Sequence, residues 1–176
     1  MLSITECAEK RRPAAVPSLY IRVGGKYELL PDNVLLKHVR KWADDRFRSG
    51  TQVLDRPELI EAFLLSKLAA RKYEVFALVL LSKRNRLIEY VEAARGTLDI
   101  TTIYSREIVR IALSRNASGV IFAHNHPSGD SSPSDADVKL TRRLRDALAY
   151  VDIRVIDHLV IGKTVTSFAK RGLLVR

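Results

Sequence analysis

Hydrophobic and polar residues follow one another along the chain in patterns that predict short strands and amphipathic helices. Residues 18–30 carry two apolar runs around a Gly-Gly pair, which predicts a hairpin with a two-residue turn. Residues 33–48 repeat apolar positions with a helical period, and their other face is basic. Residues 1–17 are polar and basic, as is typical of a mobile tail. We therefore expect residues 1–51 to form an N-terminal extension of tail, hairpin and basic helix.

The pattern over residues 52–176 predicts one α/β domain with a central mixed sheet flanked by helices. Pro57 suits the first turn of its first helix, and Ser105 suits the N-cap of its second. Asp157 and His158 are expected in a turn, and support of a metal-bound imidazole is the alternative role of this pair. The expected helices cover residues 57–72, 106–116 and 138–150, and the expected strands cover residues 74–82, 87–93, 119–123, 151–155 and 159–161, with a strand-and-turn segment over residues 164–175.

Composition limits the class of protein. The chain has 176 residues, 47% of them hydrophobic, which suffices for one domain with an extension. A single cysteine excludes an intrachain disulfide framework and fits a reducing compartment. The longest apolar run, residues 75–81, is too short to span a membrane, and residues 1–12 lack a secretory hydrophobic region. We expect a soluble cytoplasmic protein that does not enter membranes.

The formal net charge of +10 favours contact with polyanions. Basic side chains are concentrated on one face of the expected helix over residues 33–48 and on the outer face of the helix over residues 138–150. Nucleic acid is therefore one expected partner of these basic helices. Simple solvation of both faces is the alternative.

The main group of candidate functional residues follows the apolar run over residues 119–123. His124 and His126 lie two residues apart, so in an extended backbone their side chains point to the same side. A turn rich in proline and glycine follows, and Asp137 falls in the first turn of the next helix. Two imidazoles and a carboxylate, with a fourth position open for water, are typical of a catalytic zinc site. Zinc would lower the pKa of its bound water to about 7.

A simpler interpretation of the same residues needs no metal. Ser134 and Asp137 have the spacing of a capping box, in which a serine at the N-cap pairs with an acidic residue at N3. A lone His-x-His is also a weak signal. The two interpretations are compatible, because a capped helix terminus would fix the carboxylate of Asp137.

The whole constellation resembles the JAMM motif of the JAB/MPN metalloprotease family. That motif is an upstream glutamate, then His-x-His-Pro, seven residues, a serine, two residues and an aspartate. Here Pro127–Pro133 supply the seven residues before Ser134. The sequence over residues 106–109, 116–129 and 157–162 resembles the RadC branch of this family still more closely. The resemblance covers about residues 52–176 and implies a JAB/MPN domain, a fold similar to that of cytidine deaminases.

The resemblance also implies an activity, the hydrolysis of a peptide or isopeptide bond by zinc-activated water. His124, His126 and Asp137 would hold the zinc ion. Ser134 would donate a hydrogen bond to the developing oxyanion or orient the water, with helix capping as its alternative role. A protein or peptide is then the expected substrate.

Glu74 would be the general acid/base of this reaction. It stands at the head of the expected strand, where the resemblance aligns it with the JAMM glutamate. It would accept a proton from the water and deliver it to the leaving amine. Glu89 and Glu92 on the next strand stay alternatives for this role, and a solvated strand end is the other interpretation of Glu74.

The chain departs from the family pattern at two places. Asn125 stands between the histidines, where eukaryotic JAMM enzymes carry serine or threonine. Full-length RadC proteins carry a helical DNA-binding-type segment before the JAB domain. Residues 1–51 contain no recognisable hairpin motif of that helical DNA-binding type. The chain therefore resembles the short, mobile-element-associated RadC type, and no residue demonstrates DNA repair.

A second hypothesis is a metal-binding, DNA-associated protein without peptidase activity. Its basic helices would then carry the function, and its affinity for DNA would fall with salt. A deaminase is set aside because the chain lacks the Pro-Cys-x-x-Cys ligands of those enzymes. The identity of the substrate and the oligomeric state stay open.

Overall fold

The computed structural model describes residues 19–31, 33–35, 37–39, 41, 57–96 and 103–174. The predicted tail over residues 1–17 lies outside the described residues. So do Leu36, Trp42, Ala43, Arg40 and Arg46 of the predicted basic helix.

Two compact units are present, residues 1–38 and 39–176. In the first unit, β1 (Tyr20–Val23) pairs antiparallel with β2 (Lys26–Leu29), which confirms the predicted hairpin. Gly24 and Gly25 join these strands with φ angles of 56° and 87°, which favour glycine. Further along the chain, residues 33–35, 37–39 and 41 are helical, as the sequence predicts.

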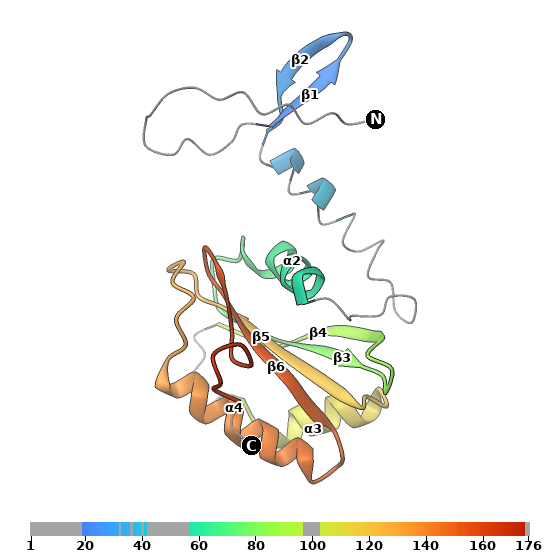
Figure 1. Ribbon diagram of the computed structural model, residues 1–176, viewed down its shortest axis with the longest axis vertical. Coiled ribbons are helices and arrows are strands. Elements are labelled where there is room, and N and C mark those ends of the chain that lie inside the picture. Colours follow the sequence, from blue (N-terminus) through green and yellow to red (C-terminus); the bar gives the residue numbers. More distant parts are fainter. Residues whose placement is uncertain are drawn as a thin grey trace. The chain divides into compact units, whose positions relative to one another are not determined.

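The second unit contains a five-stranded mixed sheet with the strand order β4-β3-β5-β6-β7. Among its described strands, β5 and β6 alone pair in parallel. Helix α2 covers one face of the sheet, and α3 and α4 cover the other (Figure 1), which confirms the predicted α/β fold. The elements are α2 (Pro57–Leu68), β3 (Val75–Leu81), β4 (Leu87–Arg95), α3 (Ser105–Ser114), β5 (Gly119–Asn125), α4 (Asp135–Ala149), β6 (Arg154–Ile161) and β7 (Val165–Ser167).

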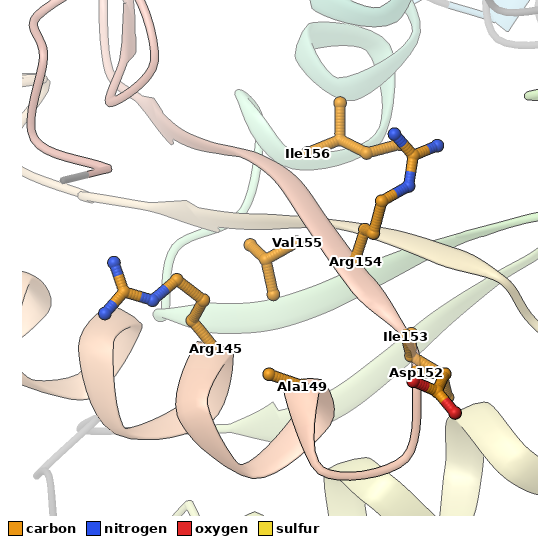
Figure 2. Close-up of a pocket in the computed structure, with 7 residues that line it drawn as sticks. All are labelled: Arg145, Ala149, Asp152, Ile153, Arg154, Val155 and Ile156. Atoms are coloured by element: carbon orange, nitrogen blue, oxygen red, sulfur yellow. The ribbon is translucent and has the colours of Figure 1, made fainter. Parts of the chain in front are cut away.

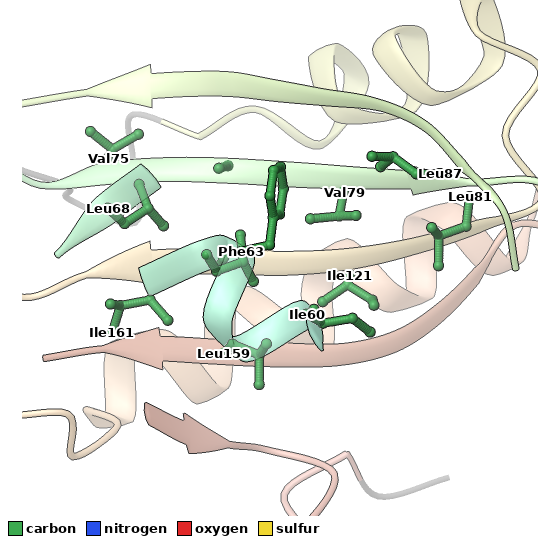
Figure 3. Packing of buried hydrophobic residues seen from close by; sticks show 13 residues of the cluster. Ile60, Phe63, Leu68, Val75, Val79, Leu81, Leu87, Ile121, Leu159 and Ile161 are labelled. Atoms are coloured by element: carbon green, nitrogen blue, oxygen red, sulfur yellow. The ribbon is translucent and has the colours of Figure 1, made fainter. Parts of the chain in front are cut away.

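Strand alternation assigns each residue of β3 to one face of the sheet. All seven residues of β3 are buried, because β4 and β5 flank the strand and helices cover both faces. Phe76, Leu78 and Leu80 pack beneath α3 and α4. The intervening residues pack beneath α2, whose Ile60, Phe63 and Leu68 lie over the sheet in Figure 3. Two apolar cores therefore enclose the sheet.

The neighbouring strand β5 follows the same rule and carries His124, and His126 follows the strand. Ile121 and Ala123 join the core beneath α2, whereas Val120 and Phe122 join the core beneath α3 and α4. The next residue with the parity of Phe122 is His124, so its side chain lies on the α4 face. The alternation thus turns a candidate metal ligand toward the helix that carries Asp137.

The prediction of a turn at Asp157 and His158 is wrong. Strand β6 runs through both residues from Arg154 to Ile161, where two shorter strands were expected. The register against β5 shifts between Val155 and Asp157, and this irregularity interrupts the alternation that sequence reasoning relies on. Asp157 is accommodated because its carboxylate accepts hydrogen bonds from Ser167 Oγ and from the backbone N–H groups of His158 and Ala169.

Some predicted helix ends are also wrong. Ser105 is the first residue of α3 rather than its N-cap, because Tyr104 occupies the cap position without a side-chain hydrogen bond. Helix α2 ends at Leu68 rather than near Lys72. Helix α4 begins at Asp135, ahead of the expected start at residue 138. Among the described residues, no helix combines the length and apolar character needed to cross a membrane.

Candidate metal centre

The two histidines converge where β5 ends. His124 is the penultimate residue of β5 and is buried, and His126 follows the strand and is half-buried. The backbone N–H of His126 donates to the carbonyl of Ile161, which fixes the chain beyond the strand. The Nε2 atoms of His124 and His126 lie 3.0 Å apart. The predicted convergence of two imidazole nitrogens is therefore present.

Asp137 approaches the same point from the first turn of α4. Ser134 is the N-cap of this helix and forms the predicted capping box with Asp137. Asp137 Oδ2 accepts hydrogen bonds from the backbone N–H of Ser134 at 2.8 Å and from its Oγ at 2.6 Å. Its other oxygen, Oδ1, lies 3.2 Å from His124 Nε2. The cap therefore holds the carboxylate with one oxygen turned toward the histidines.

The side chains of His124, His126 and Asp137 form a cluster that can hold a metal ion. One ligand atom from each of them lies within 4.8 Å of the others. On a tetrahedral zinc ion with bonds of about 2.0–2.1 Å, neighbouring ligand atoms are about 3.3 Å apart. The separations of 3.0 Å and 3.2 Å at His124 Nε2 are close to that value. Glu74 is not a member of the cluster.

The hydrogen bond behind His126 determines which of its nitrogens can bind a metal. Its Nδ1 lies 2.8 Å from the backbone carbonyl oxygen of Asp130. A carbonyl oxygen only accepts, so Nδ1 carries the hydrogen and Nε2 offers its lone pair to the cluster. This lone pair, beside a carboxylate, suits a cation. The residues present therefore fit a divalent metal ion.

The electrostatics of Asp137 agree with that role. Burial raises the pKa of its carboxyl group, but the neighbouring imidazole of His124 and the hydrogen bonds from Ser134 outweigh burial. The net effect holds the pKa of Asp137 well below its ordinary value. The group is therefore an ionised carboxylate at neutral pH, the form that binds metals.

His158 lies directly behind His124. Its Nε2 is 2.8 Å from His124 Nδ1, and its Nδ1 is 2.6 Å from Thr141 Oγ1. The ring is fully buried and stacks on Phe168 with a centroid distance of 4.6 Å. Burial lowers the pKa of His158, and the neighbouring imidazole of His124 lowers it further. His158 therefore contacts a candidate ligand from behind, and its support of a metal-bound imidazole stays a prediction.

Asn125 has a role that sequence reasoning missed. Its Oδ1 accepts a hydrogen bond from the backbone N–H of Val75 at 2.9 Å, and its Nδ2 donates to the carbonyl of Tyr73 at 3.0 Å. The two bonds bracket Glu74 and fix it beside the end of β5. The sequence contains a signal for this role, since Asn125 lies next to an apolar strand and a buried side-chain amide needs hydrogen-bond partners.

The two alternatives to Glu74 lie in ion pairs on the edge strand β4. Glu89 Oε2 is 2.7 Å from Arg115 Nε. Glu92 lies between two arginines, with Oε1 at 2.6 Å from Arg71 Nη2 and Oε2 at 2.8 Å from Arg95 Nη2. Strand β3 separates both glutamates from His124 on β5.

A concave region of about 660 Å³ lies away from this cluster (Figure 2). It is formed by the end of α4 and the beginning of β6, whereas the metal centre lies at the start of α4 and the end of β5. None of the candidate site residues lines it. The lining residues are Arg145, Ala149, Asp152, Ile153, Arg154, Val155 and Ile156.

Comparisons with known proteins point to one family. The family model described as a RadC-like JAB domain matches residues 54–173. A UPF0758 protein of Vibrio cholerae serotype O1 is 48% identical over 149 residues, which cover 85% of this chain and 94% of that relative. A UPF0758 protein of Shewanella baltica is 41% identical over 163 residues, which cover 92% of this chain and 68% of that relative. The names of these relatives state no activity.

Proposed function

Because the chain belongs to the RadC-like JAB domain family, we propose that it is a zinc-dependent hydrolase of peptide or isopeptide bonds. The five-stranded mixed sheet flanked by helices is consistent with a JAB/MPN domain. The observation that carries the proposal is the convergence of His124, His126 and Asp137. Zinc is the metal that best suits two imidazoles and one carboxylate with a position left for water.

When bound, zinc supplies Lewis acidity that makes water a stronger nucleophile at neutral pH. Glu74 would accept a proton from the attacking water and would later deliver it to the leaving amine. The side chain of Asn125 supports this role, because it fixes the backbone on both sides of Glu74. Asp137 would hold the metal together with His124 and His126, while Ser134 fixes its carboxylate through two hydrogen bonds.

The register of the sheet favours Glu74 over its two alternatives. Phe76 pairs with His124, so Glu74, two residues before Phe76, has the parity of the α4 face. Glu92 pairs with Ala77, which belongs to the core beneath α2, on the opposite face from His124.

Glu89 has the parity of the α4 face but lies at the other end of the sheet. It pairs with Leu80, and Leu80 pairs in turn with Val120, four residues before His124. Its carboxylate is therefore remote from the metal centre.

Ser134 supports the reaction chiefly through Asp137. Its hydroxyl hydrogen points to Asp137 Oδ2, so it is engaged in the resting arrangement. Donation to an oxyanion stays a prediction, and it requires the hydroxyl to turn away from Asp137 during the reaction.

The test is hydrolysis by the zinc-loaded protein, with a fluorogenic peptide library and an isopeptide-linked model substrate as probes. We expect Glu74→Gln to bind zinc normally and to lose at least about 100-fold in rate, since it cannot exchange protons. Glu89→Gln is the matched control, because its carboxylate is exposed and paired with Arg115. Equal rates in Glu74→Gln and the wild type would contradict the proposed role.

A second candidate function is DNA association in the cytoplasm. The net charge of +10 favours it, and Lys139 and Arg142 are exposed on α4, the helix that also carries Asp137. Phosphate contacts would make the logarithm of the DNA affinity fall linearly with the logarithm of the salt concentration. A duplex titration at several salt concentrations tests this, with Lys139→Gln and Arg142→Gln expected to reduce the slope. No binding at low salt would contradict it.

A further inference from the structure

The contact behind His124 decides whether this histidine can bind a metal. Its Nδ1 faces His158 Nε2 at 2.8 Å, and its Nε2 faces Asp137 and His126. In a neutral imidazole one nitrogen carries a hydrogen and the other offers a lone pair. If His158 donated in this contact, the hydrogen of His124 would be on Nε2 and would block the metal. If His124 donates, its Nε2 is free to bind.

Thr141 selects between these two arrangements. Its Oγ1 lies 2.6 Å from the backbone carbonyl oxygen of Asp137 and 2.6 Å from His158 Nδ1. A hydroxyl has one hydrogen and a carbonyl oxygen only accepts, so the hydroxyl donates to Asp137. It then accepts the hydrogen of His158 Nδ1. The reverse arrangement would place two oxygens 2.6 Å apart with no hydrogen between them.

The remaining hydrogens follow from this choice. With its hydrogen on Nδ1, the neutral His158 ring accepts at Nε2, so His124 donates from Nδ1. His124 Nε2 then directs a lone pair at the cluster. The ring of His158 is held in this orientation by its aromatic neighbours Phe76, Phe122 and Phe168.

We infer that Thr141 and His158 are positioning residues that hold His124 in the tautomer that binds a metal through Nε2. The chain of hydrogen bonds runs from β5 through β6 to α4 and ends on the backbone of Asp137. It therefore connects two candidate ligands that come from different elements. This inference rests on the proposed metal site.

A structural role alone would explain only part of the geometry. Threonine in a helix often donates to the carbonyl four residues earlier, without any function. Here both Thr141 and His158 are buried, with 1% and 0% of their surfaces exposed, and the second imidazole continues the chain to a candidate ligand. Partners behind a metal-bound histidine typically change metal affinity by 10–100-fold when they are removed.

The first test is zinc affinity in matched variants of the full chain. Thr141→Val preserves shape and removes the hydroxyl, and Thr141→Ser restores it. We expect the zinc dissociation constant to rise about tenfold in Thr141→Val and to stay near the wild-type value in Thr141→Ser. His158→Phe, which keeps an aromatic ring beside Phe168, should lose about 10–100-fold. Equal affinities in Thr141→Val and Thr141→Ser would overturn the inference.

The second test reads the tautomers directly and needs no metal. Nitrogen-15 NMR of the imidazoles, recorded at mildly alkaline pH, identifies the protonated nitrogen of each ring. We expect His158 and His124 to carry their hydrogens on Nδ1 in the wild type and in Thr141→Ser, and Thr141→Val to disturb this pattern. A hydrogen on His124 Nε2 in the wild type would overturn the inference.

The two tests separate this inference from the proposed function. Wild-type protein that binds no zinc would contradict the proposed function, and the tautomer measurement would then decide the hydrogen-bond chain by itself. Thermal unfolding of the zinc-free variants shows whether each folds. If His158→Phe unfolds at a much lower temperature than the wild type, zinc affinity is measured in His158→Gln instead. The glutamine side-chain oxygen can still accept the hydrogen of His124 Nδ1.

Discussion

The two faces of the central sheet differ in what they bury. Beneath α2 lies a core of aliphatic and aromatic side chains, and the buried Ser66 of α2 donates to the backbone carbonyl of Phe63 within its own helix. Beneath α3 and α4 the apolar core gives way, near the ends of β5 and β6, to the buried polar residues His124, His158 and Thr141. Each of these polar side chains has a hydrogen-bond partner, so their burial is compensated.

The difference separates stability from function within one sheet. Burial of polar groups costs free energy even when they are paired. Apolar residues of similar volume in their place often give equal or greater stability. The proposed metal site gives a role to this buried polar chain, because the chain begins on a candidate ligand. Substitutions beneath α2 should change the free energy of unfolding, whereas substitutions along the polar chain should change metal affinity.

The largest expected effect on stability belongs to the face beneath α2. Leu64 is fully buried there, so Leu64→Ala should lower the free energy of unfolding by about 2–5 kcal/mol. Chemical denaturation measures this, and the zinc affinity of the folded fraction should be unchanged. Leu113→Ala is the control, since Leu113 is 53% exposed and should change stability by less than about 0.5 kcal/mol. A marked loss of zinc affinity in folded Leu64→Ala would break the separation of the two faces.

Asn125 should affect both properties, because it lies at the end of β5 and fixes Glu74. Asn125→Ala leaves the N–H of Val75 and the carbonyl of Tyr73 without their partner, at a cost of about 1–3 kcal/mol. Hydrolysis by the folded variant should fall because Glu74 is no longer held, while zinc affinity persists. Denaturation and rate measurements at saturating zinc check both parts. Unchanged turnover per folded molecule would show that Asn125 serves stability alone.

The cap of α4 should have a smaller effect on stability. Ser134→Ala removes a capping hydroxyl, which typically costs about 1 kcal/mol. It also frees Asp137 Oδ2 from one of its hydrogen bonds, so zinc affinity should weaken. Ser134→Thr retains the hydroxyl and is the control. Calorimetric titration measures the zinc affinity. Equal affinities in Ser134→Ala and Ser134→Thr would contradict a contribution of the Ser134 hydroxyl to zinc binding.

The smallest effect concerns the pH dependence of the face beneath α2. Burial raises the pKa of Tyr90, and the nearby charge of Glu92 raises it further, so the folded state favours the neutral phenol. A pKa that is higher in the folded than in the unfolded state gives stability that is complete below the unfolded pKa of about 10 and is lost as pH rises above it. Urea denaturation from neutral to alkaline pH should show a steeper loss in the wild type than in Tyr90→Phe. Parallel curves would contradict this assignment.

The sequence predicts most of the fold because its periodicity is locally clear. The uninterrupted apolar run at residues 75–81 forms a strand buried on both faces, and the capping-box spacing of Ser134 and Asp137 correctly identifies the start of a helix. The candidate ligands are predictable for the same reason, since strand alternation places His124 on one face. What fails is the stretch around Asp157, where a bulge breaks the alternation.

Tertiary partners are the part of the site that a sequence does not contain. Thr141 and His158 are separated by 17 positions and meet only because α4 packs on β6. Asn125 reaches Tyr73 across 52 positions through the pairing of β3 with β5. Such contacts depend on the register between strands, which no local pattern encodes.

Zinc stoichiometry tests the central claim most directly. The purified protein is loaded with zinc, passed through a desalting column and analysed for metal content, together with Asp137→Asn and Asp146→Asn. Asp146 is exposed on the same helix and paired with Arg145, so it is a matched control. We expect one equivalent of zinc in the wild type and in Asp146→Asn, and none in Asp137→Asn. Zinc-free wild type, or full occupancy in Asp137→Asn, would contradict the metal centre.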